Sequence, residues 1–358
     1  MAGALTVLGL MSGTSLDGID VAVLTTDGEA RIEAGPWATY PYDDELRECL
    51  RGVLGGKGEV AAAERRLTLA HAAAVGRFRG EHGAAMTPPT LIGFHGHTIL
   101  HRPGEGRTWQ IGDGALLARA TGLDVVNDFR SADVSEGGEG APLAPLFHAA
   151  LAAPLERPLA VLNLGGVGNV SWIGADGHVV AFDTGPGNAP LDDWLRRTTG
   201  RAMDQDGALA RAGRIDRALL ATLLAHAYFE RPPPKSLDRD DFTAYAVAHL
   251  SAADGAATLT AFIAAAVAAG TRHFPAPVKR WLVTGGGRHN PLLMAALAEA
   301  LAAPVAAVEA VGWHGDALEA QAFAWLAVRS RRGLPLSWPS TTGVRRPLSG
   351  GRFHAAAR

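Results

Sequence analysis

The strongest constraint on this chain is an order of elements that occurs twice. Strand-like runs at residues 6–11, 19–24 and 31–37 predict a three-strand meander, with Gly-containing turns between the strands. A second meander is predicted within residues 159–182, and alternating helix and strand patterns follow each meander. We therefore predict an α/β fold of two domains with duplicated β-β-β-α-β-α-β-α topology around a cleft.

The domain boundary is expected at the proline-containing stretch 153–158. Domain I is then residues 1–155, which can also take up residues 335–358, and domain II is residues 156–334. The last predicted helix, residues 315–332, falls in domain II. The tail after it, rich in glycine and proline, is expected to be irregular.

Composition excludes several classes of protein. The chain has 358 residues, 47% of them hydrophobic, with 33 basic and 36 acidic residues, and this balance argues against disorder. A net charge of −3 gives no electrostatic footprint for nucleic acid or an anionic membrane. The longest uncharged run, residues 255–271, is shorter than the roughly 20 apolar residues that span a bilayer. With no secretory signal pattern, we predict a cytoplasmic protein without nucleic-acid or membrane partners, compatible with a homodimer.

The first turn, within residues 9–20, combines glycine, serine and threonine between two predicted strands. Backbone amides and hydroxyls in such a turn can surround phosphate oxygens, since glycine lets the backbone approach closely. Asp17 follows the hydroxyl cluster and could hold Mg²⁺, directly or through water. The alternative is a plain hairpin whose Asp-Gly pair serves the turn.

Two more glycine clusters strengthen the prediction of nucleotide binding. Gly165 and Gly166 open the second meander, and residues 285–287 follow a hydrophobic strand and precede a helix start. No Walker A motif is present, and residues 165–168 lie between two strands, so they fail the context of a dinucleotide fingerprint. Two hairpins from opposite domains could grip one polyphosphate, with the nucleoside lying against residues 285–287.

The candidate general base is Asp183, which ends a predicted strand ahead of a rigid Gly-Pro-Gly turn. A carboxylate at the carboxyl end of a strand is well placed to take a proton from a hydroxyl or from water. The alternative is that Asp183 caps the helix beginning near Pro190, a role that Asn188 could fill instead.

Other polar positions also offer groups to a ligand. Residues 94–98 follow a strand and carry two histidines; without thiolates or a nearby carboxylate, a substrate loop or a polar loop is favoured over zinc. Arg130 can neutralise an anionic substrate, with a salt bridge as the alternative. Asp316 and Glu319 share a helix face, and Glu319 can point into the cleft, with a solvated face as the alternative.

Ten segments together resemble the anhydro-N-acetylmuramic acid kinases, a family of the acetate kinase, sugar kinase, heat-shock chaperone and actin superfamily. The most specific segment contains Met-Ser-Gly-Thr-Ser-Leu-Asp-Gly within residues 9–20. The others, in chain order, are residues 93–98, 110–113, 127–130, 138–143, 163–166, 182–188, 233–236, 285–287 and 319–320. The chain departs from the family pattern at His97, where Gln is usual, and at Gly168, where Ala is usual.

This resemblance implies an actin-like ATPase fold that binds ATP and Mg²⁺, with Asp183 as the base and Asp17 toward the metal. The implied nucleotide contacts are Gly13, Thr14, Ser15, Leu16, Asp17, Gly18, Ile19, Asp20, Gly165, Gly166, Gly285, Gly286 and Gly287. The implied sugar contacts are Ser12, Thr98, Arg130, Asp183 and Glu319.

The implied activity is hydrolytic opening of the 1,6-anhydro ring of anhydro-N-acetylmuramic acid with phosphorylation of oxygen 6. The products are N-acetylmuramic acid 6-phosphate and ADP, and the role is recycling of cell-wall sugar. Two alternatives stay open. One is an ordinary sugar or carboxylate kinase in which Asp183 deprotonates a substrate hydroxyl, and the other is a chaperone-like or sensor ATPase.

Overall fold

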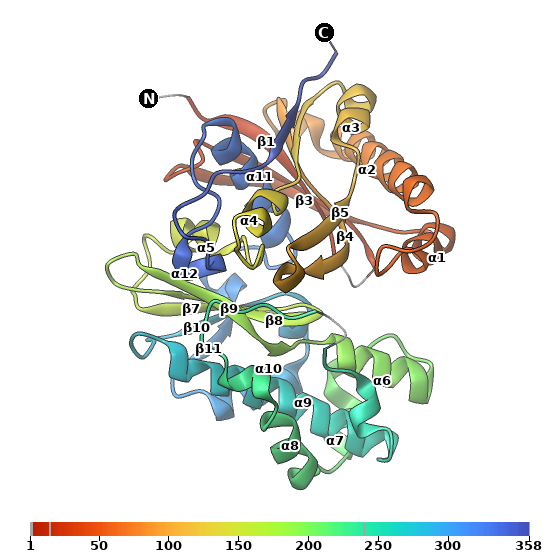
Figure 1. Cartoon of the computed structure of the whole chain (residues 1–358), viewed down its shortest axis with the longest axis vertical. Helices are drawn as coiled ribbons and strands as arrows, with labels where there is room; N and C mark the ends of the chain where they lie inside the picture. The colour runs from red at the N-terminus through yellow and green to blue at the C-terminus, as the bar shows by residue number, and fades with distance from the viewer. Residues whose placement is uncertain (1–2, 14–15, 239–240, 358) are drawn as a thin grey trace. The chain divides into compact units, whose positions relative to one another are not determined.

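The computed structural model describes residues 3–13, 16–238 and 241–357, and the chain divides into two compact units (Figure 1). Unit 1 comprises Met1–Leu151 and Ala317–Arg358, and unit 2 comprises Ala152–Asp316. The first boundary lies close to the predicted one. The second lies well before residue 334, so residues 317–334 belong with unit 1 and not with domain II as predicted.

Unit 1 is built on a seven-stranded sheet whose main path runs β12-β6-β4-β1-β2-β3, with β5 paired to β4. β1, β4 and β6 are parallel, whereas β2 and β3 continue from β1 as antiparallel strands. The strands are β1 (Leu5–Ser12), β2 (Gly18–Thr26), β3 (Ile32–Pro41), β4 (Leu91–Arg102), β5 (Arg107–Ile111), β6 (Asp124–Asn127) and β12 (Arg352–His354).

Unit 2 repeats this plan in a five-stranded sheet with the order β11-β10-β7-β8-β9. β7, β10 and β11 are parallel, and β8 and β9 are antiparallel, so the sheet matches β6-β4-β1-β2-β3 strand for strand. The strands are β7 (Leu159–Leu164), β8 (Val167–Ile173), β9 (Val179–Pro186), β10 (Trp281–Thr284) and β11 (Val305–Ala307). The predicted α/β fold with duplicated topology is confirmed.

Helices pack against both sheets, and several begin at the side-chain caps that the sequence offers. Asp113, Ser251 and Asn290 each accept a hydrogen bond from a backbone N–H of the first turn that follows. Unit 1 contains α1 (Asp44–Gly52), α2 (Val60–His82), α3 (Gly114–Thr121), α4 (Ser131–Ser135), α5 (Pro145–Leu151), α11 (Leu318–Arg331) and α12 (Pro339–Thr342). Unit 2 contains α6 (Ala189–Thr199), α7 (Ala208–Ala212), α8 (Arg217–Leu224), α9 (Ala252–Gly270) and α10 (Pro291–Ala300).

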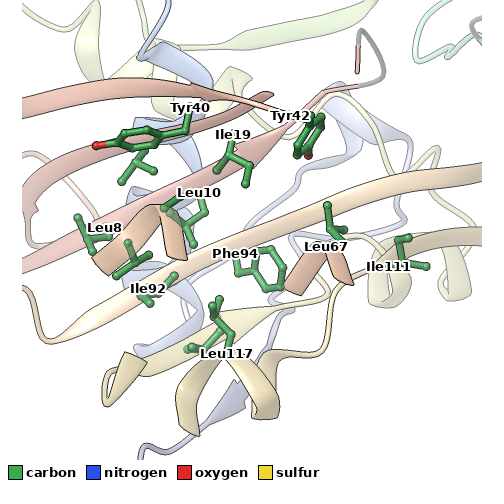
Figure 2. Close-up of a cluster of buried hydrophobic side chains, with 14 of the residues drawn as sticks. Leu8, Leu10, Ile19, Tyr40, Tyr42, Leu67, Ile92, Phe94, Ile111 and Leu117 are labelled. Carbon is green, nitrogen blue, oxygen red and sulfur yellow. The ribbon is translucent and has the colours of Figure 1, made fainter. Parts of the chain in front are cut away.

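Each unit has its own apolar core. In unit 1, Ile92 and Phe94 of β4 are fully buried with Leu67 of α2 and Leu117 of α3, as Figure 2 shows. In unit 2, side chains of the parallel strands β7 and β10 are buried with the face of α9. Parallel strands covered on both faces read as continuous hydrophobic runs, which is why the sequence located them.

α11 packs on the sheet of unit 1, and two glycines explain how. A Cβ at Gly9 of β1 would lie 1.7 Å from the backbone oxygen of Ala320, and one at Gly93 of β4 would lie 2.1 Å from that of Phe323. Only glycine permits so close an approach of helix to strand. The tail also departs from the irregular structure that was expected, because β12 pairs with β6 in antiparallel register.

Among the described residues, the helical stretch Ala252–His273 is the one long and apolar enough to cross a membrane by length and composition. It consists of α9 and the short 3₁₀ helix η6 (Thr271–His273). α9 packs against α6, α7, α10 and β9, and in Figure 1 it lies with α10 on the same side of the sheet of unit 2. A core helix of this kind passes the same test as a membrane span.

Candidate functional site

In unit 2 the structure brings two of the predicted glycine turns together. β7 and β10 are parallel neighbours with Asn163 opposite Thr284, so the turns that follow them, residues 165–166 and 285–287, leave the same edge of the sheet. Gly285 has a φ of 78°, and a Cβ there would lie 2.4 Å from Asn163 Oδ1. Position 285 therefore requires glycine, because any side chain there would collide with Asn163.

Asn188 stabilises the turn at residues 165–166 by two hydrogen bonds. Its backbone N–H donates to the oxygen of Gly165 at 2.7 Å, and its side-chain Nδ2 donates to the oxygen of Leu164 at 3.1 Å. The neighbouring Asn163 Oδ1 is buried and accepts no hydrogen bond from the described residues. A buried acceptor without a donor, beside two turns of glycines, fits a site for a ligand that presents hydrogen-bond donors.

Asp183 is held on β9 with only 6% of its surface exposed. Its Oδ2 accepts the backbone N–H of Leu237 at 2.8 Å, and its own N–H donates to the oxygen of Lys235 at 3.0 Å. The hydroxyl of Tyr228 donates to the Asp183 carbonyl. Because Asn188 occupies the N-cap of α6 and Asp183 lies within β9, the capping alternative is wrong.

In unit 1 the first hairpin joins β1 to β2. Leu16 has a φ of 59° and donates its N–H to the oxygen of Gly13 at 3.2 Å. Asp17 is exposed, and its Oδ1 accepts the N–H of Gly18 at 3.0 Å. Thr14 and Ser15, two of the predicted phosphate contacts, lie outside the described residues. Ile19 and Asp20 belong to β2, where the carboxylate of Asp20 accepts a hydrogen bond from the hydroxyl of Thr39.

A buried polar network joins the end of β1 to β4. The hydroxyl of Ser12 lies 3.0 Å from His97 Nδ1 and is also hydrogen-bonded to the hydroxyl of Tyr42. Burial lowers the pKa of His97 to about 4 and raises the pKa of Tyr42 well above its usual value, so both side chains are neutral at pH 7. His97 thus links β4 to the end of β1.

Arg130 lies at the same edge of this sheet, just after β6. Its guanidinium donates to Nε2 of His95 at 3.1 Å and to the oxygen of Gly140 at 2.7 Å. Burial, helped by the charge of Arg130, holds the pKa of His95 well below its usual range. The imidazole is then neutral and can accept from the guanidinium, which fixes Arg130 without cancelling its charge.

The remaining predicted sugar contacts also belong to unit 1. Thr98 is half-buried on β4, and its hydroxyl accepts from Gln110 Nε2 at 3.2 Å. Glu319 is half-buried in the first turn of α11. Asp316 lies before α11 begins and forms an ion pair with Arg288 at 2.7 Å, so the predicted shared helix face with Glu319 is wrong. Arg288 also lowers the pKa of Asp316.

No group of three His, Cys, Asp or Glu side chains gathers at metal-binding distance within the described part of the chain. Mg²⁺ does not need one, since it usually takes one or two carboxylates and completes its shell with phosphate oxygens and water. The exposed Asp17, in the turn between β1 and β2, fits such a limited role.

Two α/β units with one duplicated strand order and Gly-rich hairpins define the actin-like ATPase fold. Residues 5–355 match the family model described as anhydro-N-acetylmuramic acid kinase, and the chain belongs to this family. The anhydro-N-acetylmuramic acid kinase of Paramagnetospirillum magneticum is 63% identical over 97% of this chain and 99% of its own length. The protein of the same name from Rhodospirillum rubrum is 59% identical over 99% and 96%.

Solved structures resemble the chain at lower similarity. One is a ROK family glucokinase from Streptomyces griseus in complex with glucose and AMPPNP, with a TM-score of 0.43 and 15% identity over 92% of this chain and 100% of that one. Another is an activator of 2-hydroxyisocaproyl-CoA dehydratase from Clostridium difficile with bound ADPNP, with a TM-score of 0.48 and 10% identity over 92% and 96%.

Sequence reasoning gave no role to the contacts that hold Asp183. Asp183 is hydrogen-bonded to Leu237 and Tyr228, and Tyr228 accepts a hydrogen bond from Lys235. In the sequence, residues 233–236 stand out only as part of the family pattern. The available signal in the sequence was a lysine directly after three consecutive prolines, in a chain that has only three lysines.

Proposed function

We propose that this chain is an ATP-dependent kinase that opens the 1,6-anhydro ring of anhydro-N-acetylmuramic acid and phosphorylates its oxygen 6. The observation that carries the proposal is the match to this family over residues 5–355, with Asp183 present in its motif. The products are N-acetylmuramic acid 6-phosphate and ADP. The proposed role is recycling of cell-wall sugar in the cytoplasm.

Asp183 is the proposed general base. In this reaction a water oxygen bonds to the anomeric carbon, the bond from that carbon to oxygen 6 breaks, and the water proton passes to the Asp183 carboxylate. The released oxygen 6 takes the γ-phosphoryl group, and ADP leaves. The hydrogen bond from Leu237 orients the carboxylate, since it fixes the position of Oδ2.

The nucleotide contacts are proposed for the glycine turns. Residues 165–166 and 285–287 present bare backbone beside the buried, unsatisfied Asn163 Oδ1, which supports a role on the nucleotide. Residues 13–20 would contact the phosphates through backbone amides, and Asp17 would hold Mg²⁺ directly or through water. When bound, Mg²⁺ neutralises charge on the transferring phosphoryl group.

The sugar contacts are proposed for Ser12, Thr98, Arg130 and Glu319. A muramic sugar carries a lactyl carboxylate, and the guanidinium of Arg130, which is positively charged at any assay pH, is held by the neutral His95. A guanidinium is the natural partner for such a carboxylate. Ser12 is hydrogen-bonded to both Tyr42 and His97, so its hydroxyl has a fixed position from which to meet the sugar.

A comparison of acceptors tests the proposal against the ordinary sugar kinase. The purified protein is incubated with Mg-ATP and either anhydro-N-acetylmuramic acid or N-acetylmuramic acid, and sugar phosphate is measured by mass spectrometry. We expect phosphate on the product of the anhydro sugar. Phosphorylation of N-acetylmuramic acid alone would establish the ordinary kinase, and ATP hydrolysis without any sugar phosphate would favour the sensor ATPase.

A further inference from the structure

Residues 233–237 form a segment that hydrogen-bonds to Asp183 of β9, and we call this segment the Asp183 strap. Asp183 donates its N–H to the oxygen of Lys235 at 3.0 Å, and Leu237 donates its N–H to Asp183 Oδ2 at 2.8 Å. The strap therefore holds both the backbone and the carboxylate of this residue. A shift of the strap would move the hydrogen bond that orients the base.

One side chain of the strap ties it to the rest of unit 2. Lys235 is only 2% exposed, and its Nζ donates to the oxygen of Tyr228 at 3.1 Å. The ammonium lies 4.5 Å from the centre of the Tyr228 ring and 5.8 Å from that of Phe182, distances at which an aromatic face attracts a cation. Since the Tyr228 hydroxyl donates to the Asp183 carbonyl, these contacts close a loop around the base.

The loop also brings an ionisable group into an unusual environment. The charged and titratable neighbours of Lys235 are Asp183 on β9, Glu230 on the 3₁₀ helix η4 (Ala227–Glu230), Arg231 just after it, and Arg272 and His273 on η6. Burial, with the charges of Arg272 and Arg231, lowers the pKa of Lys235 to about 8. The ammonium therefore loses its proton within the pH range of an ordinary assay.

We infer that Lys235 is a positioning residue, whose ammonium fastens the Asp183 strap and thereby fixes the carboxylate for proton transfer. The inference rests on the proposed function, because it assigns Lys235 a part in the same reaction. A lysine that served only the fold would leave the pH profile of kcat in the folded enzyme unchanged. A positioning ammonium supports turnover only while it is charged.

The test compares three variants in the acceptor assay. Lys235→Met keeps the length and the apolar stem but removes the charge, Lys235→Arg keeps a charge at every assay pH, and Lys279→Met removes a surface ammonium that pairs with Glu156 in the same unit. We expect kcat of Lys235→Met to fall about 10- to 100-fold, the scale of a misplaced catalytic group, with KM for ATP unchanged. Lys279→Met should match wild type.

The pH profile gives the sharper readout. Wild-type kcat should decline as the pH rises through about 8, the decline should be absent in Lys235→Met, and Lys235→Arg should retain its own activity above that pH. A Lys235→Met enzyme with wild-type kcat, or with the wild-type alkaline decline, would overturn the positioning role. Wild-type protein that forms no sugar phosphate would instead refute the proposed function. If Lys235→Met does not fold, an alkaline decline unchanged in Lys235→Arg would overturn the inference.

Discussion

Replacing Asp183 by asparagine separates basicity from structure at the proposed base. The amide oxygen of asparagine can accept the Leu237 N–H that now bonds to Oδ2 at 2.8 Å, and the backbone bond to Lys235 does not involve the side chain. The fold and the nucleotide contacts should therefore survive. What is lost is a proton acceptor, and general-base help is worth about 10²–10⁴-fold, or about 2.7–5.4 kcal/mol of barrier.

We expect Asp183→Asn to lose turnover at about the upper end of that range, because oxygen 6 becomes a nucleophile only when the ring opens. Initial rates at saturating ATP and anhydro sugar measure the loss, and calorimetry should show nucleotide binding close to wild type. Asp176→Asn, in the exposed turn between β8 and β9, is the matched control and should keep full activity. The reasoning fails if Asp183→Asn retains more than about a tenth of wild-type turnover. It fails equally if the variant opens the ring without transferring phosphate.

Arg130→Ala should raise KM for the anhydro sugar, because it removes a charge-assisted contact of roughly 1.5–3 kcal/mol. KM for an analogue without the lactyl group should rise much less. An equal rise in KM for both sugars would exclude a contact between Arg130 and the lactyl carboxylate. Gly93→Ala should lower the free energy of unfolding in urea by about 1–3 kcal/mol or more, because the new methyl would lie 2.1 Å from a backbone oxygen of α11. Gly76→Ala is the control, because a Cβ built at Gly76 has no other atom within 4 Å, and it should raise the free energy of unfolding by about 0.5–1 kcal/mol. Equal changes in the free energy of unfolding for the two variants would contradict the close packing of α11 on β4. Burial lowers the pKa of His71 to about 4 and that of His148 to about 3, so below pH 6.5 the unfolded chain takes up protons that the folded chain does not. The free energy of unfolding should therefore fall between pH 6.5 and 4, and a His71→Leu variant with the same fall would show that this residue plays no part.

Most of the fold could be predicted because its strands and helices have recognisable local hydrophobic patterns. The meanders alternate or run hydrophobic over short stretches, and their order repeats. The helix α11 was assigned to the wrong domain, since order along the chain does not say which sheet a helix covers. The signal was present in Gly9 and Gly93, two glycines within buried strands, which mark close backbone approach. β12 was missed because it is three residues long and pairs with a strand more than 200 positions away.

The candidate site was predictable where one short segment carries the chemistry. The glycine turns 165–166 and 285–287 follow strands, as their local sequence suggested. Asp183 lies within β9, which continues to Pro186 and does not end at residue 182 as predicted. The contacts that orient Asp183 could not be predicted, because Leu237 is 54 positions away and contributes only a backbone N–H. The link from His97 to Ser12 joins residues 85 positions apart and depends on the parallel pairing of β1 with β4.

Oxygen-18 labelling tests the central claim, that water opens the ring while oxygen 6 takes the phosphoryl group. The protein is incubated with anhydro-N-acetylmuramic acid and Mg-ATP in ¹⁸O-water and quenched early. Unlabelled N-acetylmuramic acid 6-phosphate in the same water reports exchange of the anomeric hydroxyl. We predict one label on the anomeric hydroxyl of the 6-phosphate, above the exchange control, and none in the phosphate. A 6-phosphate with no label above that control, or with label in its phosphate group, would contradict the account.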